Sequence, residues 1–352
     1  MNVHTAAASP RWVPAPGWEW DRNTTHRSGY LNPIGLFTRI VPRPVNHALA
    51  VGLGSVLAYA MRKTRRVLRH NLERVGRGGF SEAKISRLIL QTFHNYARYL
   101  VDYMSMTRWG LDDIPGLFRR FHGRRVFESA LREGKGVLLV TPHLGNWELG
   151  GAFLSAQGFS LNVVSLVVPD RATVELRERV RERLGIRHLY VGRGEGPLAM
   201  IGIANALRRN EIVAMLCDRD AAESGAEGEL YGCRCRLPLG PVILAQVTGA
   251  PIIPSFVVFR NGKYEAFVGK PIRVPGARGA DREGVLREKT REIVREFEKA
   301  ISRFPDQWYN FYPSWIDGTA PRAREALPAS AGHCADRENE IGKRGSDDAE
   351  RV

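Results

Sequence analysis

The stretch VLLVTPHLGNWELGGAFLSAQ, residues 137–157, decides the fold class. It opens with the apolar run Val137–Thr141, which predicts a buried strand, and it continues into a helix over Asn146–Gln157. Pro142 and Gly145 mark a tight turn between the two. A short buried strand that leads at once into a helix is typical of an α/β unit built around a parallel sheet.

The same alternation continues toward the C-terminus. We expect a hairpin over 252–259 and 264–268, because Asn261-Gly262 is a strong turn signal. The remaining elements are three strands (161–168, 188–191 and 212–217) and four helices (173–184, 197–208, 241–248 and 282–303). The sequence therefore predicts an α/β fold with a largely parallel central sheet flanked by helices.

Three helices are predicted before this domain, over 44–61, 62–75 and 81–106. The first has the apolar stretch Val45–Met61, which is shorter than the roughly 20 residues that span a bilayer. The second, RKTRRVLRHNLERV, is a basic amphipathic helix. We expect peripheral or monotopic attachment to an anionic membrane surface rather than a spanning helix.

These patterns divide the chain into four regions. We predict a poorly ordered segment over 1–33, a helical membrane-associating region over 34–110, an α/β domain over 111–318 and a disordered tail over 319–352. The chain has 352 residues and a net charge of +15. Because the tail holds six basic and seven acidic residues, the first 318 residues carry +16. Such a charge suits nucleic acid, a phospholipid surface or an acidic carrier protein.

The cysteines exclude two classes of protein. Four cysteines in 352 residues are too few for a disulfide scaffold, and their spacing gives no paired C-x-x-C zinc pattern. Cys217 beside a histidine would suit a nucleophile for acyl transfer, but a cysteine inside the run IVAMLC is more typical of a buried apolar residue. Cys233-Arg234-Cys235 would suit redox chemistry or a metal, yet two ligands do not make a metal site.

His143 is the leading candidate for catalysis. It ends a predicted buried strand, and Glu148 falls in the first turn of the next helix. A carboxylate on one ring nitrogen fixes the tautomer and raises the basicity of the other nitrogen, which makes a general-base dyad. The spacing alone is weak, because His333 and Glu338 repeat it in the tail. The alternative is a histidine that only caps the strand end.

Asp218-Arg219-Asp220 directly follows another predicted buried strand, 212–217. The two acids would suit a divalent metal, as in nucleotide-sugar transferases, or they would support Arg219 in binding a phosphate or carboxylate. A solvated loop is the third interpretation. All three remain open from the sequence.

Weaker candidates lie in three other segments. Gly192–Gly196 resembles an anion-binding loop, although an ordinary strand–helix connection is more typical. The charged helix that follows residue 171 is typical of a solvent-exposed helix with side-chain ion pairs. Alternatively, one of Arg171, Arg181 and Arg183 would reach the site. The aromatic segment 304–315 would pack the last element onto the sheet or line a lipid groove.

Taken together, these motifs resemble the bacterial lipid A biosynthesis (late) acyltransferases, within the wider lysophospholipid and glycerolipid acyltransferases. The resemblance covers roughly 62–315. It is carried by four ordered pieces: His143-x4-Glu148, the strand ending in Asp218, the run Pro238–Ala245 with Thr248–Pro251, and Pro305-Asp306-Gln307-Trp308.

The resemblance implies transfer of a fatty acyl chain from acyl carrier protein or acyl-CoA to a glycolipid hydroxyl, at the cytoplasmic face of the bacterial inner membrane. It implies that His143 is the base and Glu148 its partner. It also implies that Asn146, the loop Asp218–Asp220 and one of the arginines shape the substrate site. The acceptor stays open, because the chain departs from the family's usual pattern at both ends.

The chemistry agrees with this interpretation. Acylating an alcohol with a thioester needs a base for the hydroxyl proton, and a histidine with a pKa near 6.5 is well suited. Since the thioester already has a good leaving group, we expect no metal or cofactor. A metal-dependent glycosyl or phosphoryl transferase that uses Asp218 and Asp220 is the alternative. Nucleic-acid binding is not expected, because no recognition helix or aromatic–basic sheet is visible.

Overall fold

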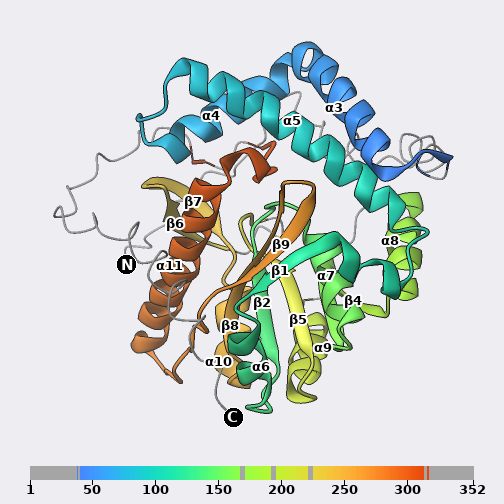
Figure 1. Ribbon diagram of the computed structural model, residues 1–352. Coiled ribbons are helices and arrows are strands. Elements are labelled where there is room, and N and C mark those ends of the chain that lie inside the picture. Colours follow the sequence, from blue (N-terminus) through green and yellow to red (C-terminus); the bar gives the residue numbers. More distant parts are fainter. Residues whose placement is uncertain are drawn as a thin grey trace, which may run out of the picture.

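A seven-stranded sheet forms the centre of the protein (Figure 1). The computed structural model describes residues 38, 40–166, 171–191, 196–220, 225–312 and 315–316. The strand order is β1-β9-β8-β2-β5-β3-β4, and every pairing is parallel except the β8–β9 hairpin. The strands are β1 (Phe118–His122), β2 (Val137–Thr141), β3 (Leu161–Leu166), β4 (Ile186–Val191), β5 (Ile212–Leu216), β8 (Ile252–Arg260) and β9 (Lys263–Val268). The predicted fold class is confirmed.

Strand β2 shows why the sheet is covered on both faces. Leu138 and Val140 belong to one apolar cluster, while Val137 and Leu139 belong to another. Successive side chains of a strand point to opposite faces, so a strand that is apolar throughout needs cover on both. The covering helices are α6 (Arg124–Leu131), α7 (Trp147–Ala156), α8 (Arg171–Arg183), α9 (Gly196–Arg208), α10 (Gly240–Thr248) and α11 (Ala280–Arg303).

Four elements were not expected from the sequence. They are strand β1, helix α6, and the two strands of a hairpin, β6 (Ala226–Leu230) and β7 (Cys233–Leu237). In β7, Cys233, Cys235 and Leu237 are buried and the two arginines between them are exposed. This alternation with period two is a strand signal that the charged residues obscured.

Three N-terminal helices lie across one end of the sheet (Figure 1). They are α3 (Arg43–Ala60), α4 (Arg62–Gly76) and α5 (Glu82–Ser105), and Ser81 caps α5 by accepting a hydrogen bond from the Lys84 amide at 3.3 Å. Helix α3 packs closely on α5: a Cβ atom on Gly54 would lie only 3.1 Å from the carbonyl oxygen of Phe93. Among the described helices none alone is long and apolar enough to cross a membrane. Helices α3 and α4 are bent by 92° relative to each other. Taken together they have the length and the composition of a membrane span, and this is the only evidence for one.

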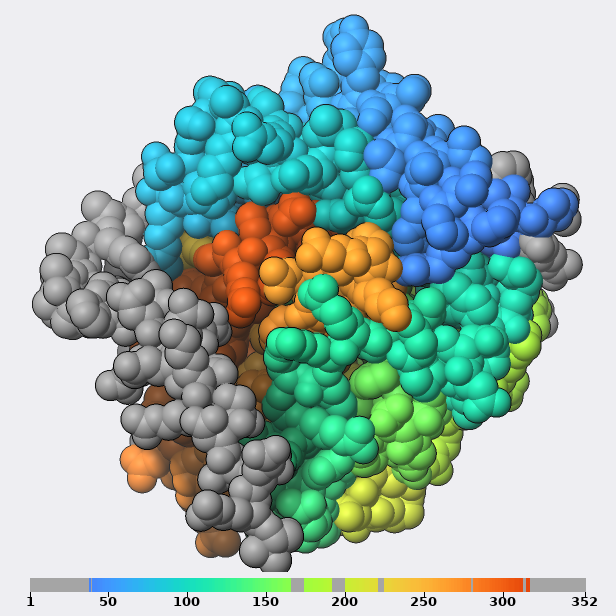
Figure 2. Space-filling view, in the orientation of Figure 1, coloured from blue at the N-terminus to red at the C-terminus, as the bar shows by residue number. Residues whose placement is uncertain are grey.

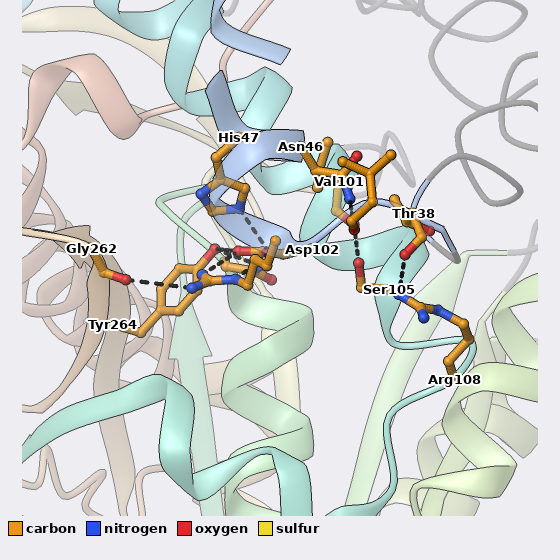
Figure 3. A network of polar contacts seen from close by, with 12 residues as sticks. Thr38, Asn46, His47, Val101, Asp102, Ser105, Arg108, Gly262 and Tyr264 are labelled. Atoms are coloured by element: carbon orange, nitrogen blue, oxygen red, sulfur yellow. Dashed lines mark hydrogen bonds and ion pairs between the residues drawn. The ribbon is translucent and has the colours of Figure 1, made fainter. Parts of the chain in front are cut away.

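A buried carboxylate ties α3 to the α/β domain (Figure 3). Asp102 of α5 is fully buried and accepts hydrogen bonds from Arg43 and from the Tyr264 hydroxyl, while its Oδ1 lies 2.9 Å from Nε2 of His47. Burial would raise the pKa of Asp102, but Arg43 and His47 hold it below its usual value. Asp102 is therefore ionised, and its contacts link α5 to α3 and to β9.

The four predicted regions are only partly described. The segment 1–33 and the tail 319–352 lie outside the described residues. The helices over 43–105 fall within the second predicted region, and the α/β elements that follow fall within the third.

Candidate functional site

His143 and Asp218 meet because their strands are neighbours. In the register of β2 and β5, Thr141 is paired with Leu216, and each strand is followed two residues later by one of the two polar side chains. The Cys217 amide continues the ladder with a 3.0 Å hydrogen bond to the Thr141 carbonyl. Nδ1 of His143 lies 2.6 Å from Oδ1 of Asp218, and the His143 amide donates to Oδ2 at 3.1 Å.

The second carboxylate oxygen of Asp218 is held from the C-terminal aromatic segment. Trp308 Nε1 donates to Oδ2 of Asp218 at 2.9 Å, and the Asp218 side chain is only 1% exposed. Burial would raise the pKa of Asp218, but His143, Arg219 and Trp308 hold it well below its usual value. The carboxylate is therefore ionised and fixed in orientation.

The aromatic segment also holds the histidine loop by its backbone. The Tyr309 amide donates to the His143 carbonyl at 2.8 Å, and the Gly145 amide donates to the Gln307 carbonyl at 2.8 Å. The described part of the segment 304–315 thus packs against the loop that carries His143. The sequence did not single out Trp308 as a ligand of Asp218, although a lone indole N–H in a buried segment needs an acceptor.

The imidazole of His143 is poised as a neutral base. Burial lowers its pKa below 6.5, the positive charge of Arg219 lowers it further, and Asp218 opposes both. A carboxylate on Nδ1 selects the tautomer in which Nδ1 carries the proton and Nε2 has a lone pair. No described residue forms a hydrogen bond with Nε2, and the side chain is 21% exposed. Trp147 packs edge-on against the ring at 5.1 Å.

Glu148 does not contact the imidazole as expected. It forms a two-point ion pair with Arg181 of α8, at 2.6 and 3.0 Å, and both side chains are under 10% exposed. The carboxylate that orients His143 is Asp218, because β5 is adjacent to β2 in the sheet whereas Glu148 turns toward α8. Burial would raise the pKa of Glu148, but Arg181 lowers it, so Glu148 is ionised.

Gly145 and Asn146 shape the turn after His143. Gly145 has φ +65°, and a Cβ atom there would lie 1.8 Å from the Val257 carbonyl oxygen, so only glycine fits. Asn146 is buried and caps α7: its Oδ1 accepts from the Leu149 amide at 2.9 Å. Its Nδ2 donates to the Tyr264 hydroxyl at 3.2 Å. Asn146, predicted to bind substrate, is thus engaged in positioning α7.

Arg219 lies beside the dyad. Its guanidinium donates to the Tyr309 carbonyl at 2.5 Å and lies 4.4 Å from the centre of the Tyr312 ring. Its buried Nε has no hydrogen-bond partner among the described residues. Asp220 turns away and accepts from Nε of Arg236 at 3.0 Å. The three residues of the loop therefore have three different surroundings.

Comparisons with known proteins give the family to which the chain belongs. The model of the bacterial lipid A biosynthesis acyltransferase family matches residues 29–316. The chain belongs to this family. It is similar to phosphatidylinositol mannoside acyltransferases of two strains of Mycobacterium tuberculosis, at 26% identity over 261 and 268 residues, covering 74% of this chain and 80% of each relative. The protein of that name from Mycolicibacterium smegmatis is 28% identical over 199 residues, covering 56% of this chain and 63% of the relative.

The predicted family and the predicted class of enzyme are thereby confirmed: the protein is an acyltransferase. Among the described residues of this lipid A acyltransferase family member, no group of three or more His, Cys, Asp or Glu side chains could hold a metal ion. Asp218 and Asp220 also belong to separate hydrogen-bond sets, as described above. Asp218 contacts His143 and Trp308, whereas Asp220 accepts from Arg236.

The remaining predicted residues have other surroundings or lie outside the described residues. Arg183 donates to the carbonyls of Thr107 and Arg108 at 2.6 and 2.7 Å, so it ties α8 to the turn that follows α5. The side chain of Arg171 and the loop residues 192–195 lie outside the described residues. Burial raises the pKa of Cys217 well above its usual value, and its side chain belongs to the core. This supports the apolar interpretation of Cys217 over the nucleophile.

Proposed function

We propose that this acyltransferase moves a fatty acyl chain from an acyl thioester to a hydroxyl of a membrane glycolipid, with His143 as general base and Asp218 as its orienting partner. One observation carries the proposal. Asp218 holds Nδ1 at 2.6 Å, while no described residue binds Nε2 on a partly exposed ring. This is the arrangement that a base needs in order to reach an incoming hydroxyl.

The proposed reaction needs only one proton carrier. Nε2 of His143 removes the acceptor hydroxyl proton as the oxygen attacks the thioester carbonyl, so that an ester C–O bond forms. The C–S bond then breaks, and the imidazolium returns the proton to the leaving thiolate. Asp218 stabilises the imidazolium between the two steps, and general-base help of this kind is worth roughly 10²–10⁴-fold in rate.

The identities of the acyl donor and of the acceptor lipid are part of this proposal. Acyl carrier protein or acyl-CoA would supply the thioester, and the basic first 318 residues suit either anionic donor. The relatives named phosphatidylinositol mannoside acyltransferases favour a sugar-bearing phospholipid as acceptor. A lipid A precursor, the acceptor implied by the family's name, is the other candidate.

We also propose that the enzyme works at the cytoplasmic face of the bacterial inner membrane, as a peripheral or monotopic protein. Support comes from α3, where several large apolar side chains are about half exposed or more, and from the arginines of α4. A glycolipid acceptor would remain in the bilayer while the soluble donor approaches from the aqueous side.

A transfer assay tests the substrates together. Purified enzyme is given acyl-CoA or acyl carrier protein with one acceptor: phosphatidylinositol mannoside, phosphatidylinositol, or a lipid A precursor. Mass spectrometry should show one added acyl chain on the mannoside and none on phosphatidylinositol. Equal acylation of phosphatidylinositol would contradict a glycolipid acceptor. Activity that a chelator abolishes would favour the metal-dependent alternative.

A further inference from the structure

A chain of buried hydrogen bonds joins α5 to the loop that carries His143. Oδ2 of Asp102 accepts from the Tyr264 hydroxyl at 2.6 Å, and the oxygen of the same hydroxyl accepts from Nδ2 of Asn146 at 3.2 Å. All three side chains are buried. The chain therefore ends at Asn146, in the turn that follows His143.

Helix α3 completes the surroundings of Asp102 (Figure 3). Arg43 donates to both carboxylate oxygens at 2.8 Å, and Nε2 of His47 lies 2.9 Å from Oδ1. Arg43 also donates to the Gly262 carbonyl, at the tip of the β8–β9 hairpin, at 3.4 Å. The space-filling view shows α3, in blue, against this hairpin, in orange (Figure 2). The start of α3 therefore packs on the elements that hold the chain of hydrogen bonds.

The charge of Asp102 sets the direction of each hydrogen bond in this chain. Although burial alone would raise the pKa of Asp102, Arg43 and His47 hold it below its usual value, so the carboxylate only accepts. The Tyr264 hydroxyl must then donate its proton to Asp102, and its oxygen accepts from an amide. This acceptor selects the orientation of Asn146 in which Nδ2 faces Tyr264.

The orientation of Asn146 matters for the turn between β2 and α7. With Nδ2 toward Tyr264, Oδ1 accepts from the Leu149 amide at 2.9 Å and caps α7. A flipped amide would set its NH2 group against the Leu149 N–H, and the cap would be lost. The Asn146 backbone amide also donates to the Val257 carbonyl at 2.8 Å, which ties the turn to β8. The chain therefore acts on the backbone that carries His143.

We propose that Asp102 is a positioning residue of this acyltransferase, which holds the His143 loop in its working geometry through Tyr264 and Asn146. Helix α3 then contributes to turnover through the contact of Arg43 with Asp102. The inference rests on the proposed function, because it takes His143 as the base. The alternative is that Asp102 only fastens α3 to the α/β domain, in which case its loss lowers stability but not the turnover of the folded enzyme.

Glu265 supplies a matched control, because it is a second buried carboxylate with the same kinds of partner. It follows Tyr264 on β9 and is bound by Arg119 and by His122, whose Nε2 lies 3.0 Å away. Successive side chains of a strand point to opposite faces, so Glu265 lies on the other face of the sheet from the Tyr264 ring. Its ion-pair partners among the described residues lie on β1 and β8, and none belongs to the turn between β2 and α7.

The test measures kcat, KM and the urea midpoint of full-length Tyr264→Phe and Glu265→Gln, with detergent-dispersed glycolipid as acceptor. Tyr264→Phe removes one hydroxyl group and keeps the ring. Because a small displacement of a catalytic group is costly, kcat should fall by roughly 10–100-fold while KM stays within about threefold. Glu265→Gln should lower the urea midpoint but keep kcat within about threefold of wild type. Equal kcat losses in the two variants, or a wild-type kcat in Tyr264→Phe, would overturn the inference.

A double-variant cycle tests whether Asp102 acts through the hydroxyl. Asp102→Asn should lower kcat as Tyr264→Phe does, and the double variant should lose no more than the larger single loss, because both changes break one chain. Losses that multiply would show that Asp102 acts by another route and would overturn the inference. If Asp102→Asn does not fold, Arg43→Gln takes its place in the cycle with the same expectations, and Arg43→Lys, which keeps the charge, should retain more activity.

Hydrogen exchange separates this inference from the proposed function. The backbone amides over 143–149 should exchange faster in Tyr264→Phe than in wild type, and Glu265→Gln should leave them unchanged. Faster exchange with an unchanged kcat would show that the chain stabilises the turn without positioning the base, and it would overturn the inference. If His143→Ala keeps the wild-type rate while Tyr264→Phe shows both the faster exchange and the lower kcat, the proposed base fails and the positioning of this loop stands.

Discussion

Asp218 lies 2.6 Å from Nδ1 of His143, and its other oxygen is held by Trp308 at 2.9 Å. The three residues come from the ends of β2 and β5 and from the C-terminal aromatic segment. Because Asp218 is fixed from two sides, the imidazole is fixed as well. The geometry therefore fixes the orientation of a histidine at a strand end, as the proposed base requires.

Replacing Asp218 by asparagine should lower turnover by roughly 10²–10⁴-fold. An amide at this position can donate to Nδ1, which would leave the proton on Nε2 and remove the base. The measurement is the initial rate of acyl transfer with the folded variant. Cys217→Ala serves as a neighbouring control. A rate within threefold of wild type for Asp218→Asn would show that the carboxylate does not orient the base.

The pH dependence of kcat/KM should report the neutral imidazole. Burial and Arg219 lower the pKa of His143, so activity should fall only as the pH drops through a value below 6.5. Removing the positive charge in Arg219→Gln favours the protonated ring, and the acidic limb should therefore move to higher pH. Arg219→Lys keeps the charge and should keep the limb near the wild-type position. A limb that stays fixed in Arg219→Gln would refute this electrostatic role.

The Glu148–Arg181 pair should matter for stability. Breaking a buried ion pair from one side typically costs about 3–5 kcal/mol, and both of these side chains are under 10% exposed. Glu148→Gln should therefore lower the urea midpoint clearly, while turnover of the folded variant falls less than in His143→Ala. Folding lowers the pKa of Glu148. The ion pair therefore contributes its full stabilisation above the usual carboxyl pKa, and this stabilisation is lost as the pH falls through the lowered pKa. Exposed Glu283, paired with Arg287, supplies the control Glu283→Gln, which should change little.

Transfer should be direct, without an acyl-enzyme on Cys217. Its thiol is buried and its pKa is raised, so almost no thiolate is present at neutral pH. Cys217→Ala should keep activity within about threefold, and kinetics with both substrates varied should give intersecting lines. A trapped thioester that disappears in Cys217→Ala would contradict this mechanism.

The sequence was sufficient for the fold class and for choosing His143 and the loop at Asp218 as candidates, and the structure brings these two residues into contact. Each residue follows an apolar run, and the carboxyl ends of parallel strands gather at one edge. The pairing was assigned to Glu148 because H-x4-E is local, whereas the adjacency of β2 and β5 depends on strand order, which a single sequence does not reveal. Trp308 was missed for the same reason: 90 residues separate it from Asp218. Strand β7 was obscured by the charges in CRCRL.

The most direct test of the account is the rate of acyl transfer by His143→Ala, measured with detergent-dispersed glycolipid and either thioester donor. The account predicts a fall of roughly 10²–10⁴-fold with an unchanged fold, as judged by circular dichroism and the unfolding midpoint. His333→Ala, which alters the accidental H-x4-E match in the tail, is the matched control and should leave the rate unchanged. A His143→Ala rate within threefold of wild type would contradict the central claim that His143 is the base.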